Sequence, residues 1–304
     1  MSDNLFEVPE GHRSGFVAVV GRPNVGKSTL MNALLGQKVA IVSPKPQTTR
    51  IRQLGILTNA QAQIVFVDTP GIHKPKTVLG EFMVNVAVQA LQDADVVLFV
   101  TDLSEQLNKA DENVAHLVAR AEGVTLLRVL NKADIGDQEH LQSHLDLITP
   151  YTAAITTTAA TGEGVPALYD LILANLPEGP RFYPPDQVSD LWERDIAAEM
   201  VREAVLLYTE QEIPHAVAVE VEEYKERENG VIYISATLYV ERDTQKAIVI
   251  GKQGSMIKQI SQHAREQIEQ LVERKVYLEL FVKVLKNWRQ DENALRRLGY
   301  RIDR

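Results

Sequence analysis

Apolar runs and helical stretches alternate along the first part of the chain. The runs are rich in β-branched residues and lie at positions 16–20, 64–67, 96–100, 126–130 and, more weakly, 153–157. This alternation predicts a mostly parallel sheet flanked by helices. In such sheets ligands bind at the carboxyl ends of the strands, where loops meet the amino termini of helices. Four of the five runs end directly in a polar motif, so this edge of the sheet is the candidate site.

A proline-rich stretch interrupts the pattern. The sequence Leu-Pro-Glu-Gly-Pro at 176–180 stops the preceding helix and cannot continue any regular element. We therefore predict one domain over residues 1–180 and a second over residues 181–304. The second domain is predicted to be α+β, with a long helix at about 188–211 and two strands at about 216–224 and 231–240. A helical hairpin, a strand at 276–285 and a final helix follow. Asn229 and Gly230 join the first two strands, which is a strong signal for a hairpin.

Charge is distributed unevenly between these domains. The net charge of −9 would by itself argue against a nucleic-acid partner, because phosphate binding draws on clustered Lys and Arg. Residues 1–180 hold 13 basic and 19 acidic side chains, whereas residues 242–304 hold 14 basic and 8 acidic ones. The basic excess near the carboxyl terminus indicates a polyanionic partner.

Neither cysteines nor long apolar stretches occur in the chain. Without cysteine no disulfide can form, and this predicts a cytoplasmic location. The apolar runs are far shorter than the roughly 18 to 20 residues that a transmembrane helix needs, so no transmembrane segment is predicted. The first residues also lack the basic start and long apolar core of a signal peptide.

The first polar motif directly follows the run at 16–20. It fits G-x-x-x-x-G-K-[ST] without a mismatch and consists of Gly21, Arg22, Pro23, Asn24, Val25, Gly26, Lys27 and Ser28, with Thr29 opening the next helix. Such a loop turns its backbone N–H groups around phosphates, and the helix amino terminus adds partial positive charge. Lys27 is predicted to reach the β and γ phosphates, and the Ser28 hydroxyl to ligate Mg²⁺.

The second motif follows the run at 64–67 and consists of Asp68, Thr69, Pro70 and Gly71. In a phosphate-loop protein an aspartate at this strand end holds Mg²⁺ through water, and the Gly71 amide bonds the γ-phosphate. The next residue, Ile72, stands where many GTPases have a glutamine that orients the attacking water. We count Ile72 with the nucleotide site and expect slow intrinsic hydrolysis.

The third motif distinguishes guanine from adenine. It follows the run at 126–130 and consists of Asn131, Lys132, Ala133 and Asp134. Guanine offers two adjacent donors that one carboxylate can accept together, and we assign that carboxylate to Asp134. Adenine would leave it desolvated and unpaired, at a cost of roughly 1–3 kcal/mol or more. Lys132 is predicted to lay its stem along the base, and Asn131 to tie this loop to the phosphate loop.

Together these motifs resemble the translation-factor-like class of GTPases, and the resemblance implies further residues. Thr48 and Thr49 are similar to the first switch, whose threonine completes Mg²⁺ coordination when GTP is present, and we favour Thr49. Thr158 and Ala159 resemble the last guanine-contacting loop. The resemblance also suggests that Asn24 helps to bind a K⁺ ion that partly replaces the missing catalytic side chain.

A G-x-x-G turn between two helical segments marks the second domain. It consists of Gly251, Lys252, Gln253 and Gly254, and Lys258 follows one turn later. Two glycines let a nucleic-acid backbone approach the main chain, and the lysines add positive charge. The element order and this turn resemble a type II KH domain, which binds RNA.

Over nearly all 304 residues the chain resembles the Era-like family of bacterial GTPases. The resemblance implies a GTP-hydrolysing switch with Mg²⁺ that binds the 3′-end region of 16S ribosomal RNA and assists assembly of the small ribosomal subunit. Some members of that family associate with the membrane surface, so peripheral contact with the inner face of the cell membrane is a further expectation. Two alternatives are a regulatory GTPase whose second domain contacts protein or membrane, and an ATP-using kinase, which the third motif opposes.

Overall fold

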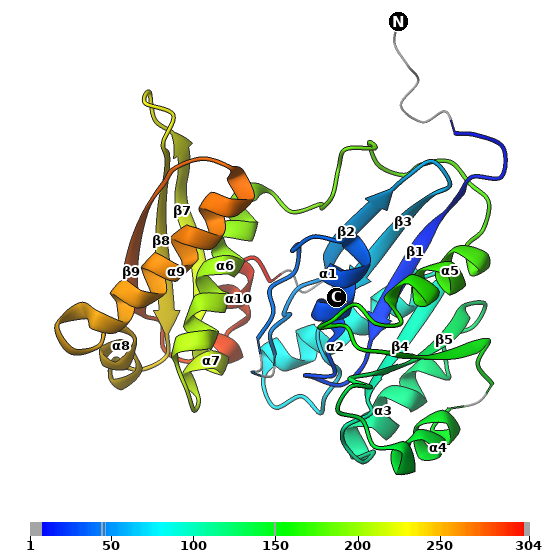
Figure 1. Ribbon diagram of the computed structural model, residues 1–304. Coiled ribbons are helices and arrows are strands. Elements are labelled where there is room, and N and C mark those ends of the chain that lie inside the picture. The colour runs from blue at the N-terminus through cyan, green and yellow to red at the C-terminus, as the bar shows by residue number, and fades with distance from the viewer. Residues whose placement is uncertain (1–7, 44, 46, 149, 301–304) are drawn as a thin grey trace, which may run out of the picture. The chain divides into compact units, whose positions relative to one another are not determined.

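The computed structural model describes residues 8–43, 45, 47–148 and 150–300 (Figure 1). Its contacts divide the chain into two compact units. Unit 1 contains the residues up to Ala40, then Thr49–Pro75 and Met83–Asp190, whereas unit 2 contains Ile41–Thr48, Lys76–Phe82 and the residues from Leu191 on. Two short segments from the first half of the sequence therefore belong to unit 2.

The segment after the predicted boundary at residue 180 still belongs to unit 1. The carbonyl oxygen of Val188 accepts a hydrogen bond from the Ile56 amide at 2.9 Å, and Asp190 Oδ1 accepts one from the Leu54 amide at 3.1 Å. These bonds attach the segment to the edge of the unit 1 sheet. The prolines end the helix as predicted, but the division into units comes about ten residues later because of this pairing.

Unit 1 contains a six-stranded sheet with the strand order β2-β3-β1-β4-β5-β6. All neighbours are parallel except β2, which is antiparallel to β3. The strands are β1 (Arg13–Val20), β2 (Gln53–Thr58), β3 (Ala62–Asp68), β4 (Val96–Asp102), β5 (Thr125–Asn131) and β6 (Ala153–Thr157). The predicted mostly parallel sheet is confirmed, and β2 is the strand that the apolar pattern missed.

Helices cover both faces of this sheet. They are α1 (Lys27–Leu35), α2 (Val78–Gln92), α3 (Lys109–Val118), α4 (Gln138–Asp146) and α5 (Val165–Asn175). One face packs on α1 and α5, with Leu30 and Ile172 in the core, and the other packs on α2 and α3, with Leu91 and Val118. Each such buried side chain contributes about 1.5–3 kcal/mol. Because both faces are buried, the strands read as continuous apolar runs.

Unit 2 contains a three-stranded sheet with the order β7-β8-β9. Strands β7 (Ala218–Glu226) and β8 (Ile232–Val240) are antiparallel, whereas β8 and β9 (Val276–Val284) are parallel. The helices are α6 (Glu193–Tyr208), α7 (Ile213–Ala216), α8 (Asp243–Ile250), α9 (Ser255–Val272) and α10 (Glu292–Arg297). Helices α6 and α9 pack on the sheet, with Val201 and Ile268 in the core. This is the predicted α+β order.

Two details of unit 2 bear on the sequence predictions. The β7–β8 hairpin turns at the predicted place, where the Gly230 amide donates to the Arg227 carbonyl oxygen at 2.9 Å. Helix α6 is shorter than the predicted helix over 188–211, because residues 188–190 pair with β2 instead. Among the described residues, no helix is long and apolar enough to cross a membrane.

Candidate functional site

The phosphate loop lies between the carboxyl end of β1 and the amino terminus of α1. Gly26 is the N-cap of α1 with φ 94°, and a Cβ atom there would lie 2.3 Å from Asn131 Nδ2, so only glycine fits. No side chain caps the helix. Its first N–H groups therefore remain for a ligand, and together with the helix dipole they favour an anion.

Lys27 is buried inside this loop. Its Nζ donates to the carbonyl oxygens of Gly21 at 3.2 Å and Arg22 at 3.0 Å, and the residue is only 7% exposed. Burial lowers the pKa of Lys27 to about 8, the charge of Asp68 opposes this shift, and the charge of Arg22 adds to it. The loop thus holds an ammonium group whose charge is incompletely compensated, which favours a phosphate ligand.

Ser28, Thr49 and Asp68 meet at the carboxyl end of β3. Asp68 Oδ2 accepts from Ser28 Oγ at 2.7 Å and from Thr49 Oγ1 at 2.8 Å, and the two hydroxyl oxygens are 3.0 Å apart. Asp68 is fully buried, and its Oδ1 has no hydrogen-bond partner among the described residues. Burial raises the pKa of Asp68, against the opposing charge of Lys27.

This oxygen cluster suits Mg²⁺. Hard divalent cations prefer carboxylate and hydroxyl oxygens, and Mg²⁺ sites usually combine one or two protein carboxylates with substrate phosphates and water. An unpaired buried carboxylate oxygen is costly unless a cation or donor satisfies it. In the described part of the chain no group of three or more His, Cys, Asp or Glu could hold a metal alone. The three residues therefore fit an ion that a phosphate ligand also coordinates.

The two candidate switch threonines have different environments. Thr49 is 8% exposed and contacts Ser28 and Asp68 as described. Thr48 belongs to unit 2, and its hydroxyl donates to the Lys45 carbonyl oxygen at 2.8 Å. The geometry thus brings Thr49, and not the Thr48 hydroxyl, to the oxygen cluster.

Asn131 joins three loops. Its Nδ2 donates to the carbonyl oxygen of Val25 in the phosphate loop at 2.8 Å. Its Oδ1 accepts from the Ala159 amide at 3.0 Å and from Thr157 Oγ1 at 3.1 Å. Asp134, three residues later, has an exposed side chain. One buried amide therefore fixes the phosphate loop, the Asn-Lys-x-Asp motif and the loop after β6 relative to one another.

The carboxyl end of β6 holds one contributor that the sequence reasoning missed. Thr157, the last residue of β6, hydrogen bonds to Asn131 through its hydroxyl and accepts from the Ala133 amide at 3.1 Å through its carbonyl. Thr158 is buried, and its amide donates to the Glu163 carbonyl oxygen at 2.9 Å. The signal was present, because Thr157 is the last residue of the fifth predicted strand.

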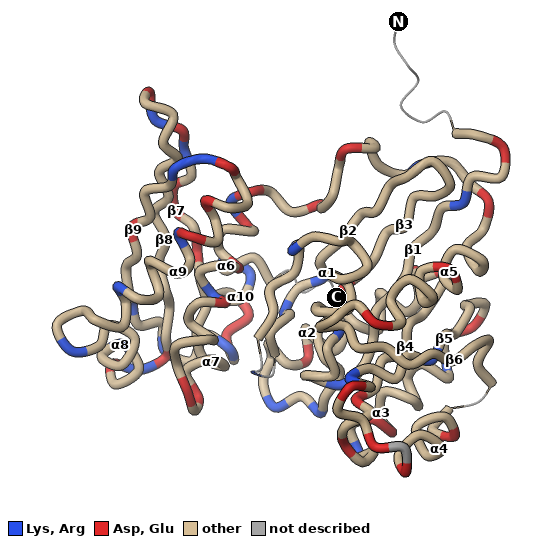
Figure 2. Tube along the Cα trace, viewed as in Figure 1, with Lys and Arg blue, Asp and Glu red and all other residues tan. Residues whose placement is uncertain are grey.

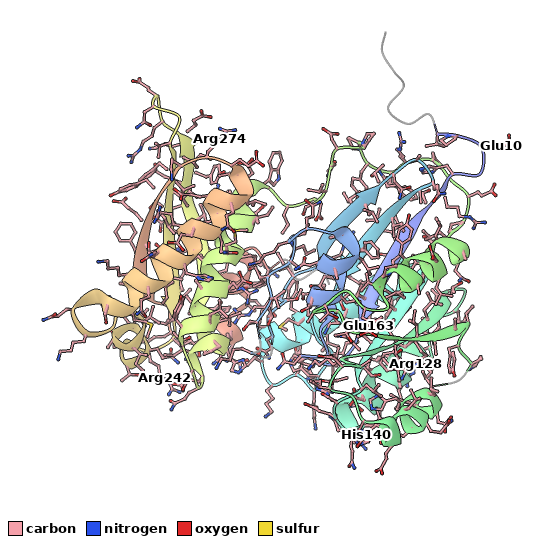
Figure 3. All side chains as sticks on the ribbon, viewed as in Figure 1. Glu10, Arg128, His140, Glu163, Arg242 and Arg274 are labelled. Atoms are coloured by element: carbon pink, nitrogen blue, oxygen red, sulfur yellow. The ribbon has the colours of Figure 1, made fainter. Side chains whose placement is uncertain are left out.

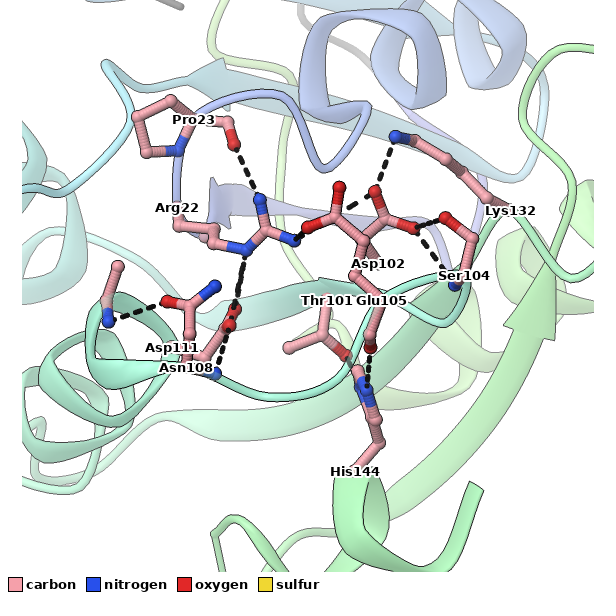
Figure 4. A network of polar contacts seen from close by, with 12 residues as sticks. Arg22, Pro23, Thr101, Asp102, Ser104, Glu105, Asn108, Asp111, Lys132 and His144 are labelled. Carbon is pink, nitrogen blue, oxygen red and sulfur yellow. Dashed lines mark hydrogen bonds and ion pairs between the residues drawn. The ribbon is translucent and has the colours of Figure 1, made fainter. Parts of the chain in front are cut away.

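A polar network connects the phosphate loop to Lys132 (Figure 4). Lys132 Nζ forms an ion pair with Asp102, the last residue of β4. Arg22 Nε donates to Asp111 Oδ1 at 3.1 Å, and Arg22 Nη2 lies 2.5 Å from Glu105 and 4.0 Å from Asp102. The sequence reasoning missed Asp102, although it follows the run at 96–100, the one predicted strand to which no motif had been assigned.

The glycine turn of unit 2 is exposed at its two middle residues and partly exposed at its two glycines. Gly251 and Gly254 have φ 74° and 78°, Gln253 between them has φ 53°, and the Gly254 amide donates to the Gly251 carbonyl oxygen at 3.2 Å. The side chains of Lys252 and Lys258 are exposed. Figure 2 shows basic positions at this turn between α8 and α9. The backbone is therefore open to an extended anionic ligand.

The histidine pair on α4 consists of His140 and His144. His140, labelled on α4 in Figure 3, lies 6.4 Å from His144 between ring centroids. His144 is buried, with Nδ1 3.0 Å from Thr101 Oγ1 and Nε2 3.0 Å from the Glu105 carbonyl oxygen. Both ring nitrogens of His144 are thus engaged within unit 1, and among the described residues no third His, Cys, Asp or Glu joins the pair in a group that could hold a metal ion.

Comparisons with known proteins match one family to each of the two parts of the chain. A family model described as 50S ribosome-binding GTPase matches residues 16–132, and a family model described as KH domain matches residues 212–289. GTPase Era of Thermotoga petrophila is 49% identical over 296 residues, which cover 96% of this chain and 98% of that protein.

Two solved structures are similar over almost the whole chain. A variant of Era from Aquifex aeolicus bound to GDP and AlF₄⁻ has a TM-score of 0.91 at 41% identity and covers 95% of this chain and 100% of that one. Era in complex with MgGDPNP and nucleotides 1506–1542 of 16S ribosomal RNA has a TM-score of 0.90 at 39% identity and covers 96% and 100%. The resemblance expected from the motifs is confirmed, and the chain belongs to the GTPase Era family.

Proposed function

We propose that this chain is a GTP-hydrolysing switch that binds the 3′-end region of 16S ribosomal RNA and assists assembly of the small ribosomal subunit. The observation that carries the nucleotide part is the Asn131 side chain, which joins the phosphate loop to the guanine motif. A site that fixes both ends of one ligand suits a guanine nucleotide. The RNA part is supported by the exposed glycine turn and by the relative whose structure contains 16S ribosomal RNA.

Asp134 is the residue proposed to select guanine. Its exposed carboxylate can accept both donors of the guanine edge, whereas adenine offers no such pair. The test is competition of GTP, GDP, ATP and ADP against fluorescent GDP on the purified chain. We expect guanine nucleotides to compete at least about a hundredfold better. Equal competition by ATP would contradict the proposal and would favour the kinase alternative.

The hydrolytic role rests on positioning and charge. Ser28, Thr49 and Asp68 would hold Mg²⁺, which supplies positive charge to the phosphates when bound. Lys27 offers its ammonium group to the same phosphates, and Ile72, which is buried and apolar, cannot orient a water molecule. Slow intrinsic turnover follows from that residue.

Asn24 is proposed to help bind a K⁺ ion, as the family resemblance suggests. It has a left-handed backbone with φ 66°, inside the phosphate loop. Single-turnover hydrolysis should be several-fold faster in K⁺ than in Na⁺ buffer at matched ionic strength. Asn24→Ala should remove the difference, whereas equal rates for the wild type in both buffers would eliminate the K⁺ proposal alone.

RNA binding is assigned to Gly251, Lys252, Gln253, Gly254 and Lys258. A G-x-x-G loop clamps about four nucleotides through their backbone, and both lysines are exposed beside it. Gly251→Asp combined with Gly254→Asp should abolish retention of a 3′-end 16S RNA oligonucleotide and leave GDP binding unchanged. Retention by the double variant would favour the alternative in which this unit contacts protein or membrane.

Coupling between nucleotide and RNA is proposed to run through the segment Ile41–Thr48. Two neighbouring residues of α6 hold both of its ends: Glu203 Oε1 accepts from the Val42 amide at 2.8 Å, and Arg202 donates to the Thr48 carbonyl oxygen. Both α6 residues are buried, at 2% and 1% exposure. The next residue along the chain is Thr49, which contacts the oxygen cluster. A γ-phosphate that orders Thr49 would therefore bias a segment that α6 already holds.

The coupling is testable by RNA titrations with GDPNP and with GDP at matched salt. We expect the two dissociation constants to differ by at least about fivefold. Arg202→Met should bring the ratio toward one, because the segment loses its carbonyl anchor. Arg265→Met, which removes a partly buried pair with Glu269 on α9, is the matched control and should keep the ratio. Identical constants for the wild-type chain would contradict the coupling.

A cytoplasmic location is proposed because small-subunit RNA is assembled there and because the sequence contains no cysteine. Peripheral contact with the inner membrane surface is proposed from the family resemblance alone. Flotation with liposomes of anionic lipid, with and without nucleotide, tests this contact. Recovery of all protein in the bottom fraction of the gradient under both conditions would contradict it.

A further inference from the structure

The carboxylate of Asp102 is held more firmly than an ion pair with one lysine would need. Asp102 is 1% exposed, and its Oδ2 pairs with Lys132 Nζ. Its Oδ1 accepts from Ser104 twice, from the amide at 3.1 Å and from the hydroxyl at 2.6 Å. With both oxygens engaged, the carboxylate has one orientation, and it presents one oxygen to Lys132.

Asp102 is charged at neutral pH in this environment. Burial raises its pKa, but the hydrogen bonds from Lys132 and Ser104 and the charge of Lys132 outweigh burial and hold the pKa below its usual range. Arg22 Nη2, at 4.0 Å, adds a second positive charge. The carboxylate of this ion pair is buried, whereas the Lys132 side chain is 34% exposed, so water screens only part of the attraction.

Asp102 is also part of the backbone frame that carries Lys132. In the sheet it is paired with Asn131, and the following amide, that of Leu103, donates to the Asn131 carbonyl oxygen at 2.9 Å. Lys132 itself has a left-handed backbone with φ 61°. Such a conformation costs roughly 1–2 kcal/mol for a residue other than glycine. The ion pair with Asp102 helps to hold this backbone in place.

Lys132 would otherwise be a flexible side chain. Ordering a free lysine side chain costs about 1.5–2 kcal/mol, and its side chain here is still 34% exposed. Because Asp102 fixes its ammonium group before any ligand binds, that entropy is already lost in the free protein. The stem of Lys132 is then available as a preformed surface beside the base.

We propose that Asp102 is a positioning residue for guanine binding, which acts through Lys132 and touches no part of the nucleotide. The inference rests on the proposed function, because it needs guanine nucleotides as ligands. Arg22, held by Asp111 and Glu105, connects the same segment to the phosphate loop. The stretch from Asp102 to Asp111 is thereby a third supporting element of the site, beside the phosphate loop and the guanine motif.

A double-mutant cycle on GDP affinity tests the proposal. Asp102→Asn keeps the shape and removes the charge, and Lys132→Met keeps much of the stem and removes the ammonium group. We expect each single change to weaken GDP binding about tenfold, equivalent to about 1.4 kcal/mol. The double variant should bind no more weakly than Lys132→Met alone, because Asp102 has then lost the group it positions. Additive losses, about a hundredfold in the double variant, would overturn the proposal.

A second ligand separates positioning from general damage to the fold. Inorganic pyrophosphate with Mg²⁺, competed against fluorescent GDP, probes the phosphate end only. Its affinity should stay within about twofold of wild type in Asp102→Asn, since Arg22 retains Glu105 and Asp111. An equal loss for pyrophosphate and GDP would overturn the proposal. Asp93→Asn, an exposed carboxylate 3.7 Å from Arg52, is the matched control and should change neither affinity.

Two further results keep the test decisive. If Asp102→Asn does not fold, as judged by its melting curve, Ser104→Ala replaces it in the same cycle. We then expect about a threefold loss with Lys132 present and none in the Lys132→Met background, and an equal loss in both would overturn the proposal. A wild-type chain that does not bind GDP would refute the proposed function itself, whereas normal GDP binding by Asp102→Asn would refute this inference alone.

Discussion

The glycine turns before α1 and α9 have similar backbones and opposite surroundings. Gly26 and Gly254 are both N-cap residues in the left-handed region, with φ 94° and 78°, and neither helix has a side-chain cap. A Cβ atom at Gly26 would lie 2.3 Å from Asn131 Nδ2, whereas nothing lies within 4 Å of one at Gly254. Lys27 is buried after the first turn, and Lys252 is exposed inside the second.

The difference matches two kinds of phosphate ligand. A closed turn, locked by side chains from other loops, can hold one small molecule at a fixed place. An open turn offers backbone and mobile charge to a ligand that enters and leaves along its length, as a nucleic acid strand does. The same local geometry therefore serves different chemistry, and the surroundings decide which.

Alanine substitution of the two N-cap glycines should give the largest difference between the two turns. Gly26→Ala combines the left-handed strain with a clash against Asn131, and we expect GDP affinity to fall more than about a hundredfold. Gly254→Ala has the strain alone, and RNA affinity should fall less than about tenfold. Titrations with fluorescent GDP and with labelled RNA measure both, and melting curves check that the variants fold. Similar losses at the two glycines would mean that the surroundings of Gly26 do not matter.

The two threonines of the first switch provide a smaller effect. Thr49→Val removes a hydroxyl from the oxygen cluster, so GDPNP affinity should fall about tenfold while GDP affinity stays nearly constant. Thr48→Val removes only the bonds to the carbonyl oxygens of Ser43 and Lys45, and both affinities should stay within about twofold. Fluorescence titrations in saturating Mg²⁺ give all four values. A larger effect of Thr48→Val would reassign the switch threonine.

The buried lysine makes nucleotide binding dependent on pH. Since burial lowers the pKa of Lys27 to about 8, the free protein loses this proton as pH rises through that value, and binding to phosphate must restore it. GDP affinity should therefore fall about fourfold from pH 7 to pH 8.5. Lys27→Met should bind weakly at both values and show no such slope.

The lowered pKa of Lys27 has the opposite effect on stability: as pH rises it weakens nucleotide binding, but it increases the free energy of unfolding. Unfolded Lys27 keeps its proton to a higher pH than folded Lys27, so the unfolded state binds more protons above about pH 8. The unfolding free energy of the nucleotide-free protein should therefore gain from this residue as pH rises through that range. Denaturant titrations of wild type and Lys27→Met, compared at each pH, isolate the contribution.

The exposed lysine should give the smallest effect. Lys252→Met removes one phosphate contact, so RNA affinity should fall only a few-fold, and the slope of log K against log salt should drop by about 0.7. GDP binding should not change. A slope equal to that of wild type would exclude Lys252 from the RNA contact.

Motifs and strands were predictable from the sequence because they are local patterns. The four motif-bearing strands and the β7–β8 turn depend on apolar runs and turn residues that neighbouring positions specify. Strand β2 was missed because it is an edge strand, and its antiparallel pairing with β3 is a tertiary contact. The start of α6 was misplaced for the same reason, because residues 188–190 bond to β2 and not to their own helix.

Site geometry was predictable only where a motif carries it. The spacing of Asp68 and Ser28 indicates one metal site, but only folding reveals that Asp68 Oδ1 lies buried without a partner. Asp102 belongs to no motif, and its pairing with Lys132 bridges two strands that are neighbours in space. The hydrogen bonds of Glu203 with Val42 and of Arg202 with Thr48 join positions about 150 apart in sequence. No local pattern could show them.

The contacts of Arg202 and Glu203 with the segment Ile41–Thr48 have a reciprocal consequence for the two ligands. If GTP rather than GDP raises the affinity of the protein for RNA, then RNA must raise the affinity for GTP over GDP by the same factor. Unfinished small subunits would then retain the triphosphate form on themselves, and their abundance in the cell would set how much of the protein is loaded. The RNA would thereby determine which nucleotide the protein carries.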